Sequence, residues 1–301
     1  MDKLSAMRAF VAAVDAGSLS AAARQVGLPL TTVSRRVSDL EAELGTRLLT
    51  RSSRRLTLTD AGNSYIDVCR RVLELLAEAE YVASGEYTTP KGQLTLTAPI
   101  VFGRLHVLPI VTEFLKAYPE IDIRLTLSDR TVSLIEDRID AAIRIGSVSD
   151  SSLVALKVGA VRRVACASLE YLAARGVPKM PADLSGHDCV TFEGLQSADA
   201  WLFPGKRGER PIAIRSRLAV TTAEAAIDAA VAGLGITCLL SYQAAPALES
   251  GALVAVLRAF EPPPFPVHIV HSGGRRLPLK IRAFLDFAAP RLRERLARQI
   301  D

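Results

Sequence analysis

Apolar residues recur at helical spacing in three successive stretches at the start of the chain. In the first stretch Leu4, Met7, Val11 and Val14 stand three and four positions apart, which is the spacing of one buried helical face. This stretch ends at Gly17. Ser18 or Ser20 can then cap a short second helix with the sequence SAAARQV. A third stretch, TTVSRRVSDLEAEL, repeats the amphipathic pattern. The pattern therefore predicts three short helices separated by tight turns.

The third predicted helix places its apolar residues on one stripe and its hydroxyls and arginines elsewhere. The stripe is formed by Val33, Val37, Leu40 and Leu44. Polar side chains at the N-terminal end of such a helix reach base edges and phosphates in proteins that read the DNA major groove. A small solvated helical bundle is the alternative. The next segment, RLLTRSSRRLTLT, has two β-prone pieces around an arginine-containing turn, which is typical of a wing along a phosphate backbone.

A long amphipathic helix is predicted next, from Asp60 to about Glu86, with Thr59 or Asp60 as its cap. Its apolar positions alternate spacings of four and three, and they are Ala61, Tyr65, Val68, Val72, Leu75, Ala79 and Val82. A repeat of 3.5 residues favours pairing with a second helix, and packing against the chain's own body is the alternative. Charge changes at the same boundary, because residues 1–58 hold nine Lys and Arg against five Asp and Glu, whereas residues 59–90 hold two against six.

Segments with the patterns of strands and helices alternate over the rest of the chain. TTPKG at residues 88–92 favours a hinge, after which QLTLTAP and IDIRLTLSD alternate apolar and polar residues as strands do. We expect a helix between them, from about Gly103 to Tyr118, and another helix between IDIRLTLSD and the strand DAAIRIG. The alternation resumes from Val164. It predicts two α/β halves with mostly parallel sheets, in which ligands bind at the carboxyl ends of strands.

The sequence resembles the LysR-type family of bacterial transcriptional regulators. The resemblance rests on the run FVAAVDAGSLSAAARQVGLPLTTVSRRVSDLEAELGTRLLTRSSRRLTLTDAG and, further on, on TAPIVFGRLHVLP, DAAIRIG, AAVAGLGI and LPLKIRAFLDF. It implies a winged helix-turn-helix, a dimerising linker helix and a two-subdomain α/β effector domain similar to periplasmic solute-binding proteins. The implied DNA-contacting residues are Thr31, Thr32, Ser34, Arg35, Arg51, Arg54 and Arg55. Leu30 departs from the family, which commonly has a polar, base-reading side chain there.

The resemblance also implies the domain boundaries. The winged helix-turn-helix covers residues 1–58, the linker helix 59–87, the hinge 88–92 and the effector-binding domain 93–301. Subdomain I then comprises about 93–161 and 267–301, and subdomain II about 162–266. The residues implied to pair two chains are Tyr65, Val68, Val72, Leu75, Ala79 and Val82.

Candidate effector-binding residues lie at strand ends and helix starts, where free backbone N–H groups favour an anionic ligand group. The residues at these places are Pro99, Ile100, Phe102, Arg130, Thr131, Thr221 and Thr222. Arg144 on the strand DAAIRIG is a further candidate, and the resemblance to the family adds Trp201 and Phe203. Arg144 can reach a ligand carboxylate or make a structural ion pair, and Trp201 can face a ligand or pack in the core. No hydroxyl stands between Ala98 and Gly103, where many family members bind carboxylates. An organic anion is therefore one candidate effector among others.

Other chemistry is sparse in the sequence. Cys69, Cys166, Cys189 and Cys238 are far apart without a CxxC pair, which favours reduced thiols over a disulfide framework or a zinc site. A redox pair of Cys166 with Cys189, and a metal site around His187, are minor alternatives. Motifs of hydrolytic or nucleotide chemistry are absent. We therefore expect neither an enzyme nor a bound cofactor.

Composition and the remaining patterns complete the expected function. The 301 residues are 49% hydrophobic and 23% charged, with a formal net charge of +5, as in a folded protein with an anionic partner. No apolar run is long enough for a membrane span, and the start lacks a secretion signal. We expect a cytoplasmic regulator that binds double-stranded promoter DNA and a small-molecule effector. The resemblance to the family also implies a homodimer and a homotetramer. It implies RNA polymerase as a further partner if the protein is an activator. The alternative is a solute-binding transport component.

Overall fold

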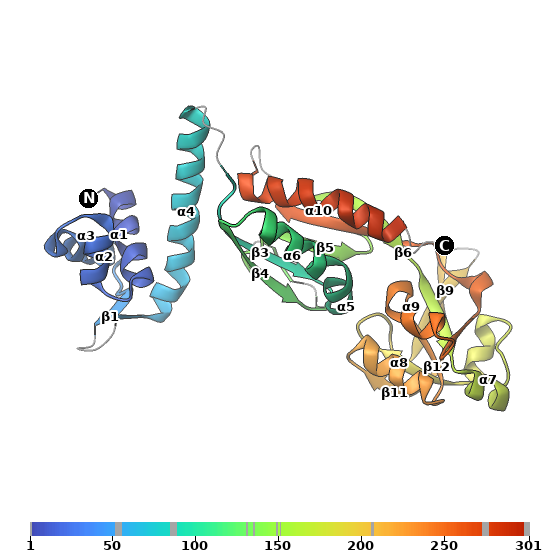
Figure 1. Cartoon of the computed structure of the whole chain (residues 1–301). Helices are drawn as coiled ribbons and strands as arrows, with labels where there is room; N and C mark the ends of the chain where they lie inside the picture. Colours follow the sequence, from blue (N-terminus) through green and yellow to red (C-terminus); the bar gives the residue numbers. More distant parts are fainter. Residues whose placement is uncertain are drawn as a thin grey trace. The chain divides into compact units, whose positions relative to one another are not determined.

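The computed structural model describes residues 2–51, 56–84, 89–130, 132–134, 136–148, 150, 152–205, 208–272 and 277–297. The chain divides into two compact units, residues 1–89 and residues 90–301. Figure 1 shows helices and one small hairpin in the first unit, and two sheets with helices around them in the second.

Three short helices and a hairpin open the first unit, and we call this part the head. The elements are α1 (Lys3–Asp15), α2 (Leu19–Val26), α3 (Leu30–Leu44), β1 (Leu49–Arg51) and β2 (Leu56–Leu58). Ser18 caps α2 because its Oγ accepts a hydrogen bond from the Ala21 backbone N–H at 3.1 Å. Gly27 and Gly45 end α2 and α3 with φ of +67° and +65°, in the left-handed region that favours glycine. The predicted order of three helices and a hairpin is confirmed.

A long helix, α4 (Asp60–Ser84), follows the hairpin and packs one face on the head. Its Ile66 and Cys69 side chains are buried in the same hydrophobic cluster as Phe10 of α1. The helix comes closest at Gly62, where a Cβ would lie 2.0 Å from the Leu48 backbone oxygen. Only a glycine allows this approach, so the start of α4 is held firmly against the head.

The predicted apolar stripe of α4 does not share one environment. Tyr65 and Val72 are half-buried against the head. Val68 and Leu75 are 39% and 48% exposed instead. One side of α4 therefore packs on the head, and another side leaves large apolar residues exposed.

The second unit contains one five-stranded sheet in the order β4-β3-β5-β14-β6, which we call subdomain I together with its helices. Its strands are β3 (Gly92–Ala98), β4 (Ile121–Leu127), β5 (Ala141–Ile145), β6 (Leu153–Val161) and β14 (Phe265–Ser272). The helices α6 (Leu108–Ala117) and α10 (Leu279–Ala297) pack against each other beside the sheet (Figure 1). Phe114 of α6 and Phe284 of α10 meet edge to face, with ring centroids 5.4 Å apart.

A second five-stranded sheet, in the order β11-β8-β12-β7-β13, belongs to subdomain II. Its strands are β7 (Arg163–Ala167), β8 (Asp188–Phe192), β11 (Arg215–Val220), β12 (Ile236–Leu240) and β13 (Val254–Val256). The other elements are the helices α7 (Leu169–Arg175), α8 (Ala223–Val231) and α9 (Ser241–Glu249), the 3-10 turns Pro181–Gly186 and Arg258–Phe260, and the hairpin of β9 (Ala200–Gly205) with β10 (Gly208–Ala213). A single hydrophobic cluster spans the two subdomains.

The expectation of mostly parallel sheets is wrong in both subdomains. In each five-stranded sheet two neighbouring pairs are parallel and two are antiparallel. The antiparallel pairs all involve β6, β7, β13 or β14. These are the strands by which the chain crosses between the subdomains, once from β6 to β7 and once from β13 to β14. Crossings without an intervening α-helix replace the βαβ units that would have kept the strands parallel.

The helix expected from about Gly103 begins three residues earlier. The elements α5 (Ile100–Phe102), a π-helical turn (Gly103–Val107) and α6 follow one another without a break. Pro109 lies in the first turn of α6, where it has no N–H to donate to the preceding turn, and the wider π-helical turn stands just before it.

The helix expected between β4 and β5 is absent from the described residues of that segment. Those residues form turns instead. The Ser133 backbone N–H donates to the Asp137 Oδ2 atom at 3.0 Å, and the Ile139 N–H donates to the Leu134 carbonyl at 2.8 Å. The Asp137 carboxylate therefore competes with backbone carbonyls for the N–H groups of this segment. This competition explains why the segment does not form the expected helix.

Candidate functional site

The helix α3 presents the residues expected to read DNA. Its apolar stripe of Val33, Val37 and Leu40 is fully buried. On the other sides Thr31 and Arg35 are exposed. Thr32 and Ser34 are half-buried, and Leu30 is 46% exposed at the first position of the helix. The side chains expected at the groove are thus on the surface of the head, opposite the stripe that fixes the helix in place.

The hairpin expected to form the wing pairs β1 with β2 in antiparallel register, from Leu49 opposite Leu58 to Arg51 opposite Leu56. Arg54 and Arg55 lie outside the described residues, and so does the side chain of Arg51.

One carboxylate holds this hairpin to α3. Glu41 Oε1 accepts hydrogen bonds from the backbone N–H groups of Leu48 and Leu49 at 2.8 and 3.0 Å. Two charge-assisted bonds from one side chain fix the hairpin against the helix. Glu41 was not predicted from the sequence, where it is one of three acidic residues, together with Asp39 and Glu43, in the C-terminal half of α3.

At the start of α5 one of the backbone N–H groups that were expected to be free already has a partner in the chain. The Ile100 N–H donates to the Asp129 Oδ1 atom, which follows the end of β4, at 3.0 Å. Burial raises the pKa of the Asp129 carboxyl, and the nearby Glu224 adds to that rise. The position that an anionic ligand group would take beside Pro99 and Ile100 is therefore taken by a carboxylate of the protein itself. The sequence analysis missed Asp129 because only the fold brings it to this helix.

Phe102 contributes to the contact between the two subdomains. Its side chain is fully buried, and its ring meets that of Tyr242 of α9 edge to face, with centroids 5.3 Å apart. His106 lies 4.7 Å from the Phe102 centroid and 5.8 Å from that of Tyr242. Burial lowers the pKa of His106 to about 4, so the imidazole is neutral at pH 7.

The remaining polar candidates have local partners or are exposed. Arg144 donates from Nη2 to the Val132 carbonyl at 2.6 Å, which ties the turn segment to β5. Arg130 is exposed, and Thr131 lies outside the described residues.

The threonines before α8 are exposed as well. Thr222 caps this helix, because its Oγ1 accepts from the Ala225 backbone N–H at 3.3 Å. Thr221 precedes it on the surface.

Trp201 and Phe203 point into the core of subdomain II. They are 0% and 6% exposed and belong to a hydrophobic cluster with Leu184 and Ile236. The indole Nε1 has no hydrogen-bond partner in the described part of the chain. Of the two alternatives that the sequence left open for Trp201, this burial favours packing over contact with a ligand.

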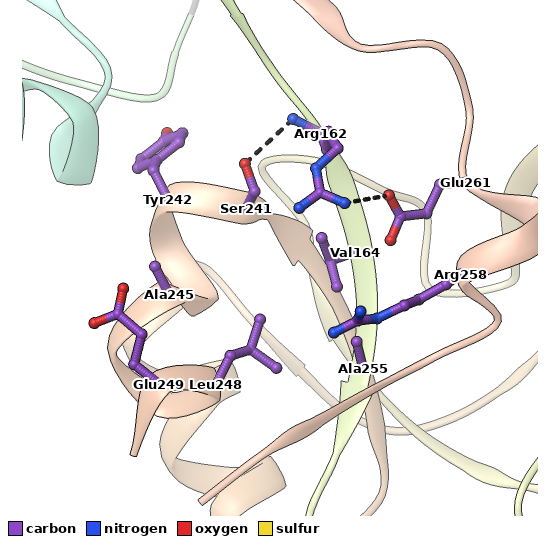
Figure 2. Close-up of a pocket in the computed structure, with 10 residues that line it drawn as sticks. All are labelled: Arg162, Val164, Ser241, Tyr242, Ala245, Leu248, Glu249, Ala255, Arg258 and Glu261. Atoms are coloured by element: carbon purple, nitrogen blue, oxygen red, sulfur yellow. Dashed lines mark hydrogen bonds and ion pairs between the residues drawn. The ribbon is translucent and has the colours of Figure 1, made fainter. Parts of the chain in front are cut away.

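A pocket of about 330 Å³ lies in subdomain II, between α9 and the strands β7 and β13 (Figure 2). Its apolar wall consists of Val164, Ala245, Leu248 and Ala255, and its charged side chains are Arg162, Glu249, Arg258 and Glu261. Arg162 Nη1 and Glu261 Oε2 form an ion pair at 3.2 Å. The sequence analysis did not identify this pocket, because its lining comes from segments up to 99 residues apart.

The four thiols offer little reactivity. All four cysteines are free and buried. Burial raises the pKa of the Cys166 and Cys189 thiols to about 12, and that of Cys69 and Cys238 to about 11. Because the thiolate is the reactive form, such pKa values argue against a redox pair.

The adjacent residues His187, Asp188 and Cys189 do not converge on one point. The His187 Nδ1 atom lies 3.2 Å from the Tyr171 hydroxyl, whereas Asp188 Oδ2 lies 3.4 Å from Arg217 Nη1. Among the described residues no three His, Cys, Asp or Glu side chains are grouped so that they could hold a metal ion. In the same part of the chain no helix is long and apolar enough to cross a membrane.

Family models match both units of the chain. The model described as a bacterial regulatory helix-turn-helix protein of the lysR family matches residues 4–63, and the LysR substrate binding domain matches residues 88–293. An HTH-type transcriptional repressor of Pseudomonas aeruginosa is 37% identical over 95% of this chain and 91% of its own length. The HTH-type transcriptional regulator CrgA of Neisseria meningitidis is 33% identical over 94% and 95%.

Solved structures agree with these matches along the whole chain. The structure of CrgA, a LysR-type regulator from Neisseria meningitidis, has a TM-score of 0.60 and 31% identity, and covers 97% of this chain and 98% of that one. The full-length structure of AphB, a virulence activator of Vibrio cholerae, has a TM-score of 0.59 and 29% identity, with coverage of 95% and 98%. The chain belongs to the LysR family of bacterial transcriptional regulators, with a helix-turn-helix DNA-binding domain and a two-subdomain α/β effector-binding domain.

Proposed function

We propose that this regulator reads its operator with the N-terminal half of α3. The observation that carries the proposal is the orientation of this helix. Its buried stripe of Val33 and Val37 leaves Thr31, Ser34 and Arg35 on the accessible side, and side chains of these types recognise base edges and phosphates. Leu30 offers only apolar contact, which fits a thymine methyl group.

The hairpin β1–β2 would act as the wing, with Arg51, Arg54 and Arg55 along the phosphate backbone. Glu41 supports this role because it bonds the first strand of the hairpin to α3. A wing held in this way keeps a constant angle to the reading helix, so the two elements would dock on DNA as one body. Contacts of wing arginines with phosphates would add affinity for any sequence.

Two chains would pair through α4. Val68 and Leu75 carry this part of the proposal because they are large, apolar and exposed on a helix whose other side packs on the head. Tyr65 and Val72 would flank the seam, and Ala79 and Val82, whose side chains lie outside the described part, would extend it. A dimer places two heads on two half-sites, which matches the symmetry of bacterial operators. Two such dimers would form the homotetramer.

The second unit would sense a small molecule between its two subdomains. A ligand that binds one arrangement of the subdomains better shifts the population toward it, and the change reaches the DNA heads through the dimer. The Asp129 carboxylate at the start of α5 supports an effector that places a neutral or cationic group there. The protein would act in the cytoplasm without catalytic activity, and an activating member would contact RNA polymerase.

Operator titration by fluorescence anisotropy tests the proposed reading helix. The DNA upstream of the protein's own coding sequence serves as the specific probe, and a shuffled sequence of equal length serves as the control. The substitution Arg35→Gln should cost about 10-fold or more on the operator, and much less on shuffled DNA. Arg282→Gln, on the exposed side of α10, is the matched control and should change neither affinity. Equal losses on both probes would mean that α3 does not read sequence.

A further inference from the structure

The pocket beside α9 is separate from the cleft residues that the family resemblance implies. It is lined by residues of α9, β7 and β13 and of the segment after β13. None of Pro99, Arg130 and Thr222 is among its lining residues. Its volume of about 330 Å³ is at the lower end of the ~300–1,000 Å³ typical of small-molecule sites. An occupant of this pocket would therefore be small and distinct from a ligand of the cleft.

The apolar side of the pocket suits a short hydrocarbon body. Val164 projects from β7 and Leu248 from α9, and Ala245 and Ala255 line the same pocket (Figure 2). The two alanines are half-buried. Their short side chains leave the space that an aliphatic or small aromatic group would fill. Removal of such a group from water favours binding.

The charged side of the pocket suits an anion. Figure 2 shows the Arg162 and Arg258 side chains on the same side of the pocket, with Glu249 on the α9 side, away from both guanidinium groups. Within the described part of the chain Arg258 has no ion-pair partner. Arg162 uses Nη1 for Glu261, and its Nε is buried without a hydrogen-bond partner. An entering carboxylate would accept from both arginines.

We propose that this pocket binds a small organic monocarboxylate. Its carboxylate would accept hydrogen bonds from the guanidinium groups of Arg258 and Arg162. Its apolar body would lie on Val164 and Leu248. Charge-assisted bonds to guanidinium groups are the strongest contacts available here, so they set the orientation of the ligand.

The position of the pocket connects its occupant to the contact between the subdomains. Arg162 lies in the first crossing, between β6 and β7, and Glu261 lies in the second crossing, before β14. A carboxylate that accepts from Arg162 competes with Glu261 and loosens the ion pair that joins the two crossings. Tyr242 lines one end of the pocket while its ring packs on Phe102 of subdomain I. Occupancy therefore favours one arrangement of the crossings over another.

Isothermal titration calorimetry on the full chain tests the ligand class with matched probes. The carboxylates are 4-methylpentanoate and 3-phenylpropanoate, and the controls are their primary amides, which keep the shape and lose the charge. Acetate keeps the charge and lacks the apolar body. We expect at least one carboxylate to bind about 10-fold or more tightly than its amide, and more tightly than acetate. No binding of either carboxylate at 10 mM, or equal binding of acid and amide, would overturn the proposal.

Two substitutions locate the site. Arg258→Gln removes an exposed side chain, so the fold should persist, and the preference for acid over amide should disappear. Arg130→Gln is the matched control, because Arg130 is an exposed arginine of the cleft set outside this pocket. Loss of binding in Arg130→Gln with full binding in Arg258→Gln would place the carboxylate in the cleft instead, and would overturn the proposal while leaving the proposed effector function intact.

Hydrogen exchange measured by mass spectrometry gives a readout that does not depend on the substitutions. The bound carboxylate should slow exchange in peptides covering residues 158–166 and 241–261, which form the walls of the pocket. Protection confined to residues 98–103 and 219–224 would contradict the assignment.

Discussion

Acidification should weaken the contact between the two subdomains through a single buried histidine. His106 is 5% exposed and packs beside the rings of Phe102 and Tyr242, which also contact each other. Its Nε2 atom is buried without a hydrogen-bond partner in the described part of the chain. Burial is the main reason why the pKa of His106 falls to about 4, and the positive charge of Arg295 lowers it further. Protonation in the folded state would place an uncompensated charge among aromatic rings.

The size of the effect follows from the difference between the pKa values of His106 in the folded and in the unfolded chain. The unfolded chain takes up the proton near the ordinary pKa of 6.5, whereas the folded chain takes it up only near pH 4. The stability due to the neutral imidazole is therefore complete above pH 6.5 and is lost as the pH falls toward 4. At about 1.4 kcal/mol per pKa unit the full loss is about 3 kcal/mol, and about 2 kcal/mol of it is already lost at pH 5. This is a large fraction of the ~5–15 kcal/mol that stabilises a typical domain.

Urea denaturation at pH 7.5 and pH 5.0 measures this loss. Trp201 is the only tryptophan of the chain and is fully buried in the second unit, so its fluorescence reports the unfolding of that unit. The substitution His106→Leu removes the titrating group and keeps an apolar side chain. On going from pH 7.5 to 5.0 the unsubstituted protein should lose about 2 kcal/mol more than the variant. Carboxylates that titrate near pH 5 are common to both proteins and cancel. The same loss in both proteins would refute the assignment of the acid sensitivity to His106.

Three further predictions concern DNA binding and assembly. Replacement of Arg54 and Arg55 by Ala should weaken binding to operator and random DNA alike and should lower the salt slope by about 0.9 per lost phosphate contact; a titration at several salt concentrations checks this, and unchanged affinity for both DNAs would remove the wing assignment. Leu75→Asp should dissociate the dimer in analytical ultracentrifugation and reduce operator affinity by about 10²- to 10⁴-fold, because the second head is no longer tethered; a mutant that keeps both its dimer and its affinity would contradict pairing through α4. A chain of residues 93–301 should show the circular dichroism of a folded α/β protein and no DNA affinity. DNA binding by this part would contradict the assignment of DNA binding to the head.

Elements that depend on short-range patterns were predictable from the sequence. The serine cap of α2 and the glycines that end α2 and α3 act within a few residues of one another, so the sequence alone contains the whole interaction. The buried stripe of α3 follows from the same logic, because one helical period decides which residues face the core. The separation of Val33 and Val37 from Thr31 and Arg35 was therefore visible without a structure.

Features that depend on long-range contacts were not predictable in this way. The direction of β14 beside β5 and β6 depends on a chain crossing that periodicity does not record. The hydrogen bond that the Ile100 N–H donates to Asp129 joins residues 29 positions apart in the sequence. The ion pair of Arg162 with Glu261 joins residues 99 positions apart. Each of these pairs comes together only after the sheets have formed. The candidate cleft was consequently assigned to these strand ends without the carboxylate that lies at one of them.

The heptad pattern of α4 omits the residues that pack this helix on its own head. The stripe left out Ile66 and Cys69, yet these two residues are the ones buried against the head. Gly62 explains the difference, since it lets the helix approach the head backbone along a line next to the stripe rather than on it. Val68 and Leu75 are left uncovered as a result. Full burial of such a side chain is worth about 1.5–3 kcal/mol, and a twofold pairing would bury the same residues from both chains. In the proposed dimer the fold of the head and the pairing of two chains therefore rely on different residues of one helix, which is why a substitution at Leu75 should separate the two.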